Sequence, residues 1–223
     1  MRTSNTSKRT LASIAGLALL AVPLAACSSD NGSSNSSSAS QSAPKPVASL
    51  DDLSKGKTTA IKLDAGFVNA LKTLKLTPGV VGTAKLTAGS LVFPITGGNV
   101  TIFKPGKVSP YVIGQVQHEG SGLSLTAGGT KVELTNFNVD PGVSRVYGDV
   151  TVNGKVAATS AYLFKLDGRT LKPLSMKGTD AVLQGTKVEI SDVAAPLLNQ
   201  TFKTDAVKPG LLVGIATITV ATK

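Results

Sequence analysis

The sequence contains one cysteine, one histidine and no tryptophan, and these shortages exclude several kinds of protein. A single cysteine cannot form a disulfide within the chain, so a folded domain must be stable through its own core. Without tryptophan there is no sugar-binding cleft walled by stacked indole rings. With only three tyrosines and six phenylalanines, the core has to be built mainly from Val, Ile, Leu and Ala.

The charges are distributed in a way that also excludes some partners. The formal net charge is +10, and Arg2, Lys8 and Arg9 near the N-terminus carry part of it. The other lysines are scattered, and no basic run is interleaved with aromatic residues, so we expect no nucleic-acid binding. The charge is compatible with an attraction to anionic lipid or to anionic envelope polymers.

Residues 1–26 have the pattern of an export signal, with a basic start and an apolar run at 11–25. This run is shorter than the ~20 residues that a transmembrane helix needs. It ends in Leu24-Ala25-Ala26-Cys27, which resembles the lipobox of bacterial lipoproteins at every position. The resemblance implies cleavage before Cys27, lipidation of Cys27 and attachment to the extracytoplasmic face of the cell membrane. The alternative is an ordinary secretory signal with an incidental cysteine.

The rest of the chain divides into a tether and a domain. Residues 27–50 begin with the lipidated cysteine and continue as a serine-rich segment that offers little apolar surface to bury, which predicts a flexible tether. Residues 51–223 have the length of one domain with one core. Their turn signals recur roughly every 8–12 residues. We therefore expect a mostly β (α+β) extracytoplasmic domain, an antiparallel sandwich or barrel-like sheets with two short helices.

Two segments predict the helices. Asp64 can cap a helix at 66–74, because Phe67 and Leu71 lie on one face of it, together with Ala70 and Leu74. Ser191 or Asp192 can cap a second short helix, in which Ala194, Leu198 and Phe202 lie on one face. About ten strands are expected, at 58–64, 80–86, 91–93, 99–103, 111–118, 122–126, 131–140, 144–152, 155–166, 181–190 and 211–222.

Turn and phase signals specify how some of these strands pair. Glu119-Gly120-Ser121 predicts a hairpin turn between 111–118 and 122–126. The apolar pattern changes phase within 131–140, which predicts a bulge near Thr135-Asn136. Asn153-Gly154 predicts a two-residue type I′ turn, because both of its residues tolerate positive φ. Its register places Tyr147 opposite Ser160 and Arg145 opposite Tyr162.

That register gathers aromatic and basic side chains on one face of the hairpin. Tyr147 and Tyr162 are predicted to be diagonal neighbours beside Arg145, and Phe164 continues the same face. One interpretation is that a helix covers this face, with the phenol groups at its rim. The other is a small-ligand surface.

The sequence offers little for catalysis or metal binding. A Ser-His-Asp triad would have to use His118, whose predicted place at the end of a strand is typical of a turn residue or a ligand contact. Asn136, Asn138 and Asp140 could offer oxygens to calcium, but with a single carboxylate they also fit a polar outer face. We therefore expect no enzyme, no catalytic residue and no metal site.

The run from Gly114 to Leu123, Gly-Gln-Val-Gln-His-Glu-Gly-Ser-Gly-Leu, is similar to a segment of HtaA-type domains, Gly-x-Val-x-(x)-x-His-x-Gly-x-Leu. These are haem-binding surface modules of actinobacteria. The resemblance implies a β-rich surface domain in which His118 supports a tyrosine that holds haem iron from the early helix. Here the predicted helix at 66–74 contains Phe67, Asn69 and Leu71 and no tyrosine, so haem lacks a matching ligand.

Together these patterns predict a cell-envelope lipoprotein whose domain is a non-enzymatic binding module for a small hydrophobic ligand, either lipid or haem-like. The candidate ligand-binding residues are His118, Arg145, Tyr147 and Tyr162, and no other cofactor is expected. The alternative is a structural or adhesive surface lipoprotein with a filled core. A cavity lined by aliphatic side chains would separate the two.

Overall fold

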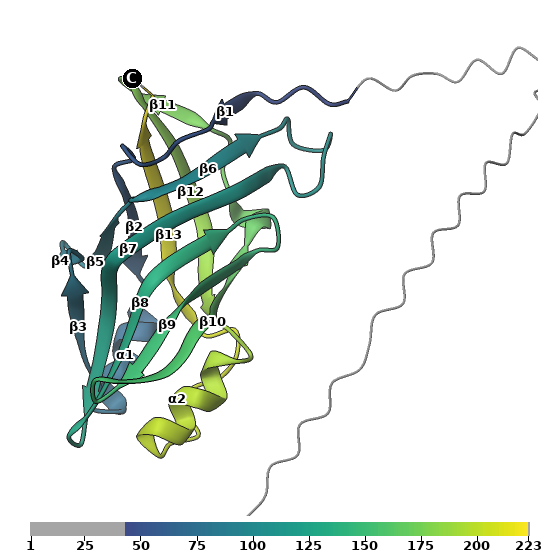
Figure 1. The fold of residues 1–223 in the computed structure, drawn as a ribbon. Helices are drawn as coiled ribbons and strands as arrows, with labels where there is room; N and C mark the ends of the chain where they lie inside the picture. Colours follow the sequence, from purple (N-terminus) through teal and green to yellow (C-terminus); the bar gives the residue numbers. More distant parts are fainter. Residues whose placement is uncertain (1–42, 223) are drawn as a thin grey trace, which may run out of the picture. The chain divides into compact units, whose positions relative to one another are not determined.

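The computed structural model describes residues 43–222, which form one curled antiparallel sheet with two α-helices at one end (Figure 1). Cys27, the export signal and most of the predicted tether lie outside the described residues. The predicted mostly β class with two short helices is confirmed. The strands belong to one continuous sheet rather than to the two sheets of a sandwich. They run in the order β1-β6-β7-β8-β9-β10-β12-β13-β2-β5-β4, with β3 paired to β7 and β11 to β12.

Turns and loops connect the strands and helices along the chain. The first half of the chain contains β1 (Ala48–Leu50), β2 (Thr58–Leu63), α1 (Ala65–Thr73), β3 (Thr77–Gly82), β4 (Lys85–Thr87), β5 (Ser90–Pro94), β6 (Gly97–Ile102) and β7 (Val112–Ala127). The second half contains β8 (Thr130–Asp140), β9 (Arg145–Val152), β10 (Lys155–Asp167), the 3₁₀ turn η1 (Gly168–Thr170), β11 (Ser175–Lys177), β12 (Asp180–Ile190), α2 (Ala194–Phe202) and β13 (Leu212–Ala221). Strand β1 lies in the segment predicted as tether and pairs with β6. The single strand predicted at 80–86 is divided into β3 and β4.

Helix α1 forms where its cap and its apolar stripe predict. The Asp64 carboxylate accepts hydrogen bonds from the backbone N–H groups of Gly66 at 2.8 Å and Phe67 at 3.2 Å. These bonds satisfy donors that the first helical turn leaves free. Phe67 and Leu71 are buried against the sheet. The predicted helix at 66–74 is therefore confirmed.

Helix α2 begins at Ala194, and a serine three residues before it makes hydrogen bonds to both the helix and the sheet. Ser191 Oγ accepts from the backbone N–H of Ala194 at 2.9 Å and donates to the carbonyl oxygen of Tyr162 at 2.7 Å. Of the two predicted caps, Ser191 accepts a hydrogen bond from the first helical residue, but the residue directly before α2 is Val193, whose side chain makes no cap bond. The helix buries Ala195 and Leu198, and it ends at Lys203 with φ +53°. Both helices lie at the lower end of the sheet in Figure 1.

The long strand β7 corrects the hairpin predicted between 111 and 126. The chain does not reverse at Glu119-Gly120-Ser121; it continues as one strand with an irregularity between His118 and Gly122 where it pairs with β8. Glycine and serine in this segment predict a turn, but in the structure they form a bulge inside a strand. The tertiary pairing with β8 on one side, and with β6 and β3 on the other, keeps both halves in the sheet.

Neighbouring bulges bend the middle of the sheet, and side chains connect them. The bulge predicted near Thr135-Asn136 is confirmed, with Asn136 at φ +54°. Asn136 Oδ1 accepts from the Gly120 N–H at 3.0 Å, and its Nδ2 donates to Asp149 Oδ2 at 2.9 Å. Asp149 Oδ1 in turn accepts from the Ser160 N–H at 3.0 Å, at a further bulge in β10. Bulges increase strand twist and bend, so this row helps to curl the sheet.

The hairpin of β9 and β10 closes as predicted and then changes register. Asn153 and Gly154 have φ values of +49° and +76°, and Lys155 pairs with Val152. Beyond this point bulges in β10 shift the pairing, so Tyr162 lies opposite Tyr147 rather than diagonal to it. The predicted pairing of Arg145 with Tyr162 is also wrong, because Arg145 pairs with Lys165. A turn fixes register only until the next inserted residue.

Candidate functional site

The concave side of the curled sheet encloses a cavity of about 650 Å³. This volume lies in the range of about 300–1,000 Å³ that is typical of small-molecule sites. Inward-facing side chains from most of the strands form its wall, since alternate residues of a strand point to the same face. The wall is mainly aliphatic and includes Leu53, Ile61, Leu91, Val100, Ile102, Val116, Val139, Leu183, Val188, Val213, Ile218 and Val220.

Three phenylalanines and the histidine form an aromatic part of this wall. Phe137 packs edge-to-face against Phe93 and Phe164, with ring centroids 5.2 Å and 5.9 Å apart. His118 lies edge-on to Phe93 at 6.3 Å. Phe164 was predicted on the tyrosine face, but the register shift between Tyr162 and Phe164 turns it into the cavity.

His118 is a buried wall residue, which corrects its predicted place at the end of a strand. Only 1% of the residue is exposed. Nδ1 lies 3.2 Å from the carbonyl oxygen of Phe137, which can only accept, so Nδ1 carries the proton. Nε2 then accepts from the Thr59 hydroxyl at 2.7 Å. Burial lowers the pKa of His118 to about 4, against a smaller opposing effect of the Phe137 carbonyl, so the ring is neutral at physiological pH.

The other predicted ligand residues lie on the opposite face of the sheet. Tyr147 and Tyr162 are opposite one another with ring centroids 6.1 Å apart, and Arg145 Cζ lies 4.5 Å from the centre of the Tyr162 ring. The predicted gathering of two tyrosines and an arginine is therefore confirmed. Val146 lies between Arg145 and Tyr147 and lines the cavity, so Arg145 and Tyr147, together with Tyr162 opposite Tyr147, face away from the cavity and from His118.

The cavity opens where residues of its wall become exposed. Its exposed wall residues are Ser109, Pro110, Lys165, Gly168 and Arg169. Lys165, Asp167 and Arg169 are also the only charged residues among those that line it. The sequence patterns assign no role to this group, because Lys165 lies in the strand predicted at 155–166 and Asp167 and Arg169 lie beyond its end. Two basic residues flanking an acid at the end of a long strand were the available signal.

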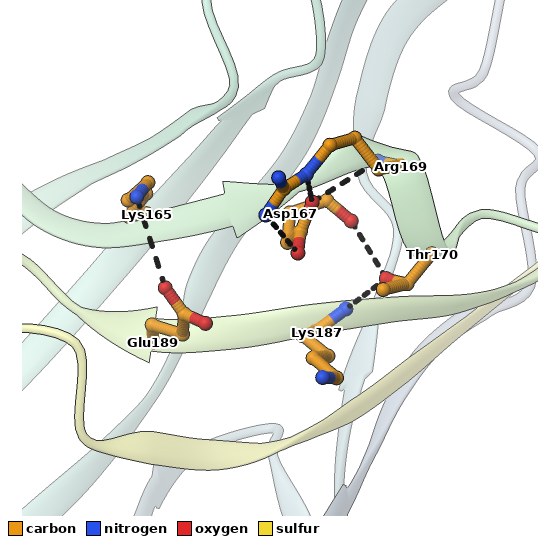
Figure 2. A network of polar contacts seen from close by, with 6 residues as sticks. All are labelled: Lys165, Asp167, Arg169, Thr170, Lys187 and Glu189. Carbon is orange, nitrogen blue, oxygen red and sulfur yellow. Dashed lines mark hydrogen bonds and ion pairs between the residues drawn. The ribbon is translucent and has the colours of Figure 1, made fainter.

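Figure 2 shows the polar contacts of this group, which connect β10, η1 and β12. Arg169 Nε and Nη2 bind the two carboxylate oxygens of Asp167 at 2.8 Å and 3.0 Å. The guanidinium holds the pKa of Asp167 below its ordinary value, and Lys187 contributes further. Lys165 Nζ lies 4.0 Å from Glu189 Oε2. Phe164 and Leu166 line the cavity on either side of Lys165, so the Lys165–Glu189 pair lies on the face of the sheet that is turned away from the cavity.

Tyr111, in the segment between β6 and β7, contacts the segment after η1. Its hydroxyl donates to the carbonyl oxygen of Leu171 at 3.4 Å. Burial raises the pKa of Tyr111, so the phenol stays protonated.

Neither a metal cluster nor a membrane-spanning helix occurs among the described residues. No group of three or more His, Cys, Asp or Glu side chains is close enough to hold a metal between residues 43 and 222. Of the suggested calcium oxygens, Asn136 Oδ1 accepts from the Gly120 N–H at 3.0 Å and Asp140 Oδ1 accepts from the Val143 N–H at 3.2 Å, whereas Asn138 Oδ1 is buried without a hydrogen-bond partner. In this part of the chain no helix is both long and apolar enough to cross a bilayer.

Comparisons with known proteins find solved structures of similar fold, but no matching sequence family. No family model and no curated protein matches the chain. The C-terminal domain of HtaA from Corynebacterium glutamicum is 14% identical, with a TM-score of 0.52 over 78% of this chain and 98% of that chain. The resemblance to HtaA-type domains therefore extends to the fold.

Two further solved structures from the same organism are similar with lower scores. A domain-swapped dimer variant of the HtaA domain has a TM-score of 0.45 at 14% identity, over 71% of this chain and 92% of that one. The haem-binding protein HtaB has a TM-score of 0.45 at 11% identity, over 78% of this chain and 96% of that one.

Proposed function

We propose that this protein is a non-enzymatic binding module of the cell envelope that holds a small hydrophobic ligand inside its curled sheet. The observation that carries the proposal is the aliphatic cavity of about 650 Å³. Protein interiors are normally close-packed, so a void of this size lined by apolar side chains is unusual unless something fills it. The same observation disfavours the alternative of a structural protein with a filled core.

The ligand is aliphatic rather than haem. Both nitrogens of His118 already make hydrogen bonds, so neither is available to iron without the loss of one of them. Tyr111 is the one tyrosine that lines the cavity, and its hydroxyl binds Leu171 at the opening. A hydrocarbon chain needs none of these groups, because burial of apolar area alone favours its transfer from water.

The hydroxyl–imidazole pair in the cavity wall, Thr59 and His118, gives no support for catalysis. Thr59 and His118 are placed like a nucleophile and its base, but a backbone carbonyl takes the position of the orienting carboxylate. A base with a pKa near 4 is also weak at neutral pH. The pair therefore satisfies two buried polar side chains and offers one polar point to a ligand.

The place of action follows from the lipobox. Acyl chains on Cys27 would hold the protein on the extracytoplasmic face of the membrane, and the serine-rich segment would separate the domain from it. There the cavity would meet lipids and other hydrophobic molecules of the envelope.

The test uses a chain that begins at residue 43, because the core of this unit consists of its own residues. Native mass spectrometry after detergent-free purification should detect a co-purified hydrophobic ligand. Once that ligand is stripped, the neutral dye Nile red should bind with a saturable rise in fluorescence. Stripped protein that never binds the dye would overturn the proposal.

A pair of matched variants locates the bound dye. Ala181 lines the cavity, so Ala181→Phe should fill part of it and weaken dye binding. Ala60 lies between Thr59 and Ile61, which line the cavity, and so faces the other side of β2. Ala60→Phe should therefore leave dye binding unchanged. Equal effects of the two variants would place the dye outside the cavity.

A further inference from the structure

Among residues 43–222, no charged side chain faces the interior of the cavity. Lys165 and Asp167 share the outer face of β10, and the Arg169 guanidinium is bound there to the Asp167 carboxylate. A charged group that entered the cavity would lose its hydration without gaining a partner of opposite charge, which is costly. The cavity therefore favours a neutral ligand.

Thr59 and His118 form a polar point within an apolar part of the wall. Phe93 and Ile218 lie beside Thr59 in the register of β5, β2 and β13, and both line the cavity. His118 follows Tyr111, at the opening, by seven residues along the extended strand β7, a distance of about 20 Å. A ligand that reaches the pair therefore has its polar end inside the cavity and its hydrocarbon towards the opening.

A chain of hydrogen bonds fixes the direction of the Thr59 hydroxyl. The Phe137 carbonyl oxygen can only accept, so His118 Nδ1 donates to it across 3.2 Å. Burial lowers the pKa of His118 to about 4, which keeps the ring neutral and leaves Nε2 as an acceptor. The Thr59 hydroxyl donates its single proton to this nitrogen at 2.7 Å. That proton is therefore not available to a ligand.

Thr59 Oγ1 can accept a hydrogen bond from a ligand but cannot donate one. A hydroxyl oxygen has two lone pairs, and within the described part of the chain the side chain of Thr59 makes no hydrogen bond other than the one to His118. Thr59 lines the cavity, and 5% of the residue is exposed. A ligand hydroxyl thus finds an acceptor in Thr59, whereas a ligand ether or ester oxygen gains no donor from it.

We propose, on the basis of the function proposed above, that the ligand is a neutral aliphatic alcohol whose hydroxyl group donates a hydrogen bond to Thr59 Oγ1 inside the cavity. His118 acts as a positioning residue, because it fixes the direction of the Thr59 proton. An ether or ester placed at the same point would leave two acceptors facing one another, and unpaired buried acceptors are unfavourable. The wall therefore selects the ligand by the direction of one hydrogen bond.

The test compares undecanol with its isomer decyl methyl ether by displacement of Nile red from the stripped chain that begins at residue 43. The two probes contain the same atoms, but the ether has no hydrogen-bond donor. The ratio of alcohol affinity to ether affinity should be about fivefold higher in the native chain than in Thr59→Val, the net effect of one hydrogen bond. Valine keeps the shape of threonine, and its methyl group covers His118 Nε2, so the alcohol cannot bind that nitrogen instead.

Thr58→Val is the matched control. Thr58 precedes Thr59 on β2 and does not line the cavity, so the same substitution there acts on the other face of the strand. This variant should keep the native ratio of alcohol to ether affinity. Loss of the ratio in Thr58→Val as well as in Thr59→Val would overturn the assignment to Thr59.

His118→Leu tests the direction of the hydrogen bond. Leucine has a volume similar to that of histidine but accepts no hydrogen bond, so the Thr59 proton becomes free to bind the ether oxygen. The ratio of alcohol to ether affinity should then fall, because the ether gains a partner that it lacks in the native chain. An unchanged ratio in His118→Leu would overturn the role of His118.

The outcomes separate this inference from the proposed function. Equal ratios in the native chain and in Thr59→Val would overturn the alcohol inference and leave the cavity as a site for other aliphatic ligands. If Thr59→Val does not fold, the native ratio is compared with the ratio of the two partition coefficients from water into hexadecane, and equality of the two ratios would overturn the inference. Failure of both probes and of Nile red to bind would overturn the proposed function itself.

Discussion

The stability of the domain should fall as the pH is lowered from 8 to 5, because its one histidine is buried in the neutral form. His118 is 1% exposed, and burial lowers its pKa from 6.5 to about 4. In the unfolded chain the imidazole regains the ordinary pKa of about 6.5. Between these two values the unfolded state binds more protons than the folded state, so stability decreases as the pH decreases.

The size of the effect follows from the two pKa values. Linkage gives a loss of about 2 kcal/mol between pH 8 and pH 5, and about 3 kcal/mol once both states are protonated below pH 4. The carboxylates of Asp52, Glu133 and Asp167 have pKa values below the ordinary range. Their contribution is lost only under more acidic conditions, so the interval from pH 8 to pH 5 reports the histidine.

Urea unfolding followed by circular dichroism at several pH values measures this loss for the chain that begins at residue 43. His118→Gln cannot be protonated and should have nearly constant stability over the same interval. If that variant does not fold, the ring protons of His118 in the native protein provide a second measurement by NMR and should show no titration midpoint above about pH 5. A midpoint near 6.5, or unchanged stability of the native chain between pH 8 and pH 5, would refute the reasoning.

The remaining predictions concern the turn, the bulges, the anchor and haem. Gly154→Val should lower the free energy of unfolding by about 1 kcal/mol or more, because a β-branched residue is strained at positive φ; unchanged urea stability would contradict this. Asn136→Ala should cost about 1 kcal/mol by the same measurement, since two exposed hydrogen bonds between neighbouring bulges are lost and alanine adopts positive φ less readily than asparagine, and a neutral effect would show that these hydrogen bonds do not stabilise the bulges. Cys27→Ala should leave uncut precursor without acylation, whereas normally processed, lipid-anchored variant would exclude the lipobox. Haemin should give no saturable Soret shift, and a stoichiometric complex lost in Tyr147→Phe or Tyr162→Phe would place an iron site on the outer face.

Local signals were sufficient for several parts of the fold. The Asp64 cap, the Asn153-Gly154 turn and the bulge near Asn136 all depend on residues close together in the sequence, whose backbone preferences act over short distances. The fold class follows in the same way from the spacing of turns and apolar residues. The resemblance carried by Gly114–Leu123 also pointed to a fold that the structural comparison supports.

The candidate site was predicted less well, because its composition depends on strand register. Each bulge moves every later residue of a strand to the other face. The shift after Tyr162 separated Phe164 from the tyrosines and turned it into the cavity with His118. No local pattern located that shift, so the sequence placed together residues that the sheet divides between its two faces.

The sequence by itself determined the class of the domain, its two helices and its tight turn, because each depends on short-range backbone preferences. Its route to the envelope stays a prediction from a contiguous motif. Only the tertiary structure decided that the strands form one curled sheet, that this sheet encloses a cavity, and that His118 lies in its wall. The environment of His118 is set by Thr59 in β2 and Phe137 in β8. Such long-range contacts exist only once the whole sheet has formed, and the chemistry of the site depends on them.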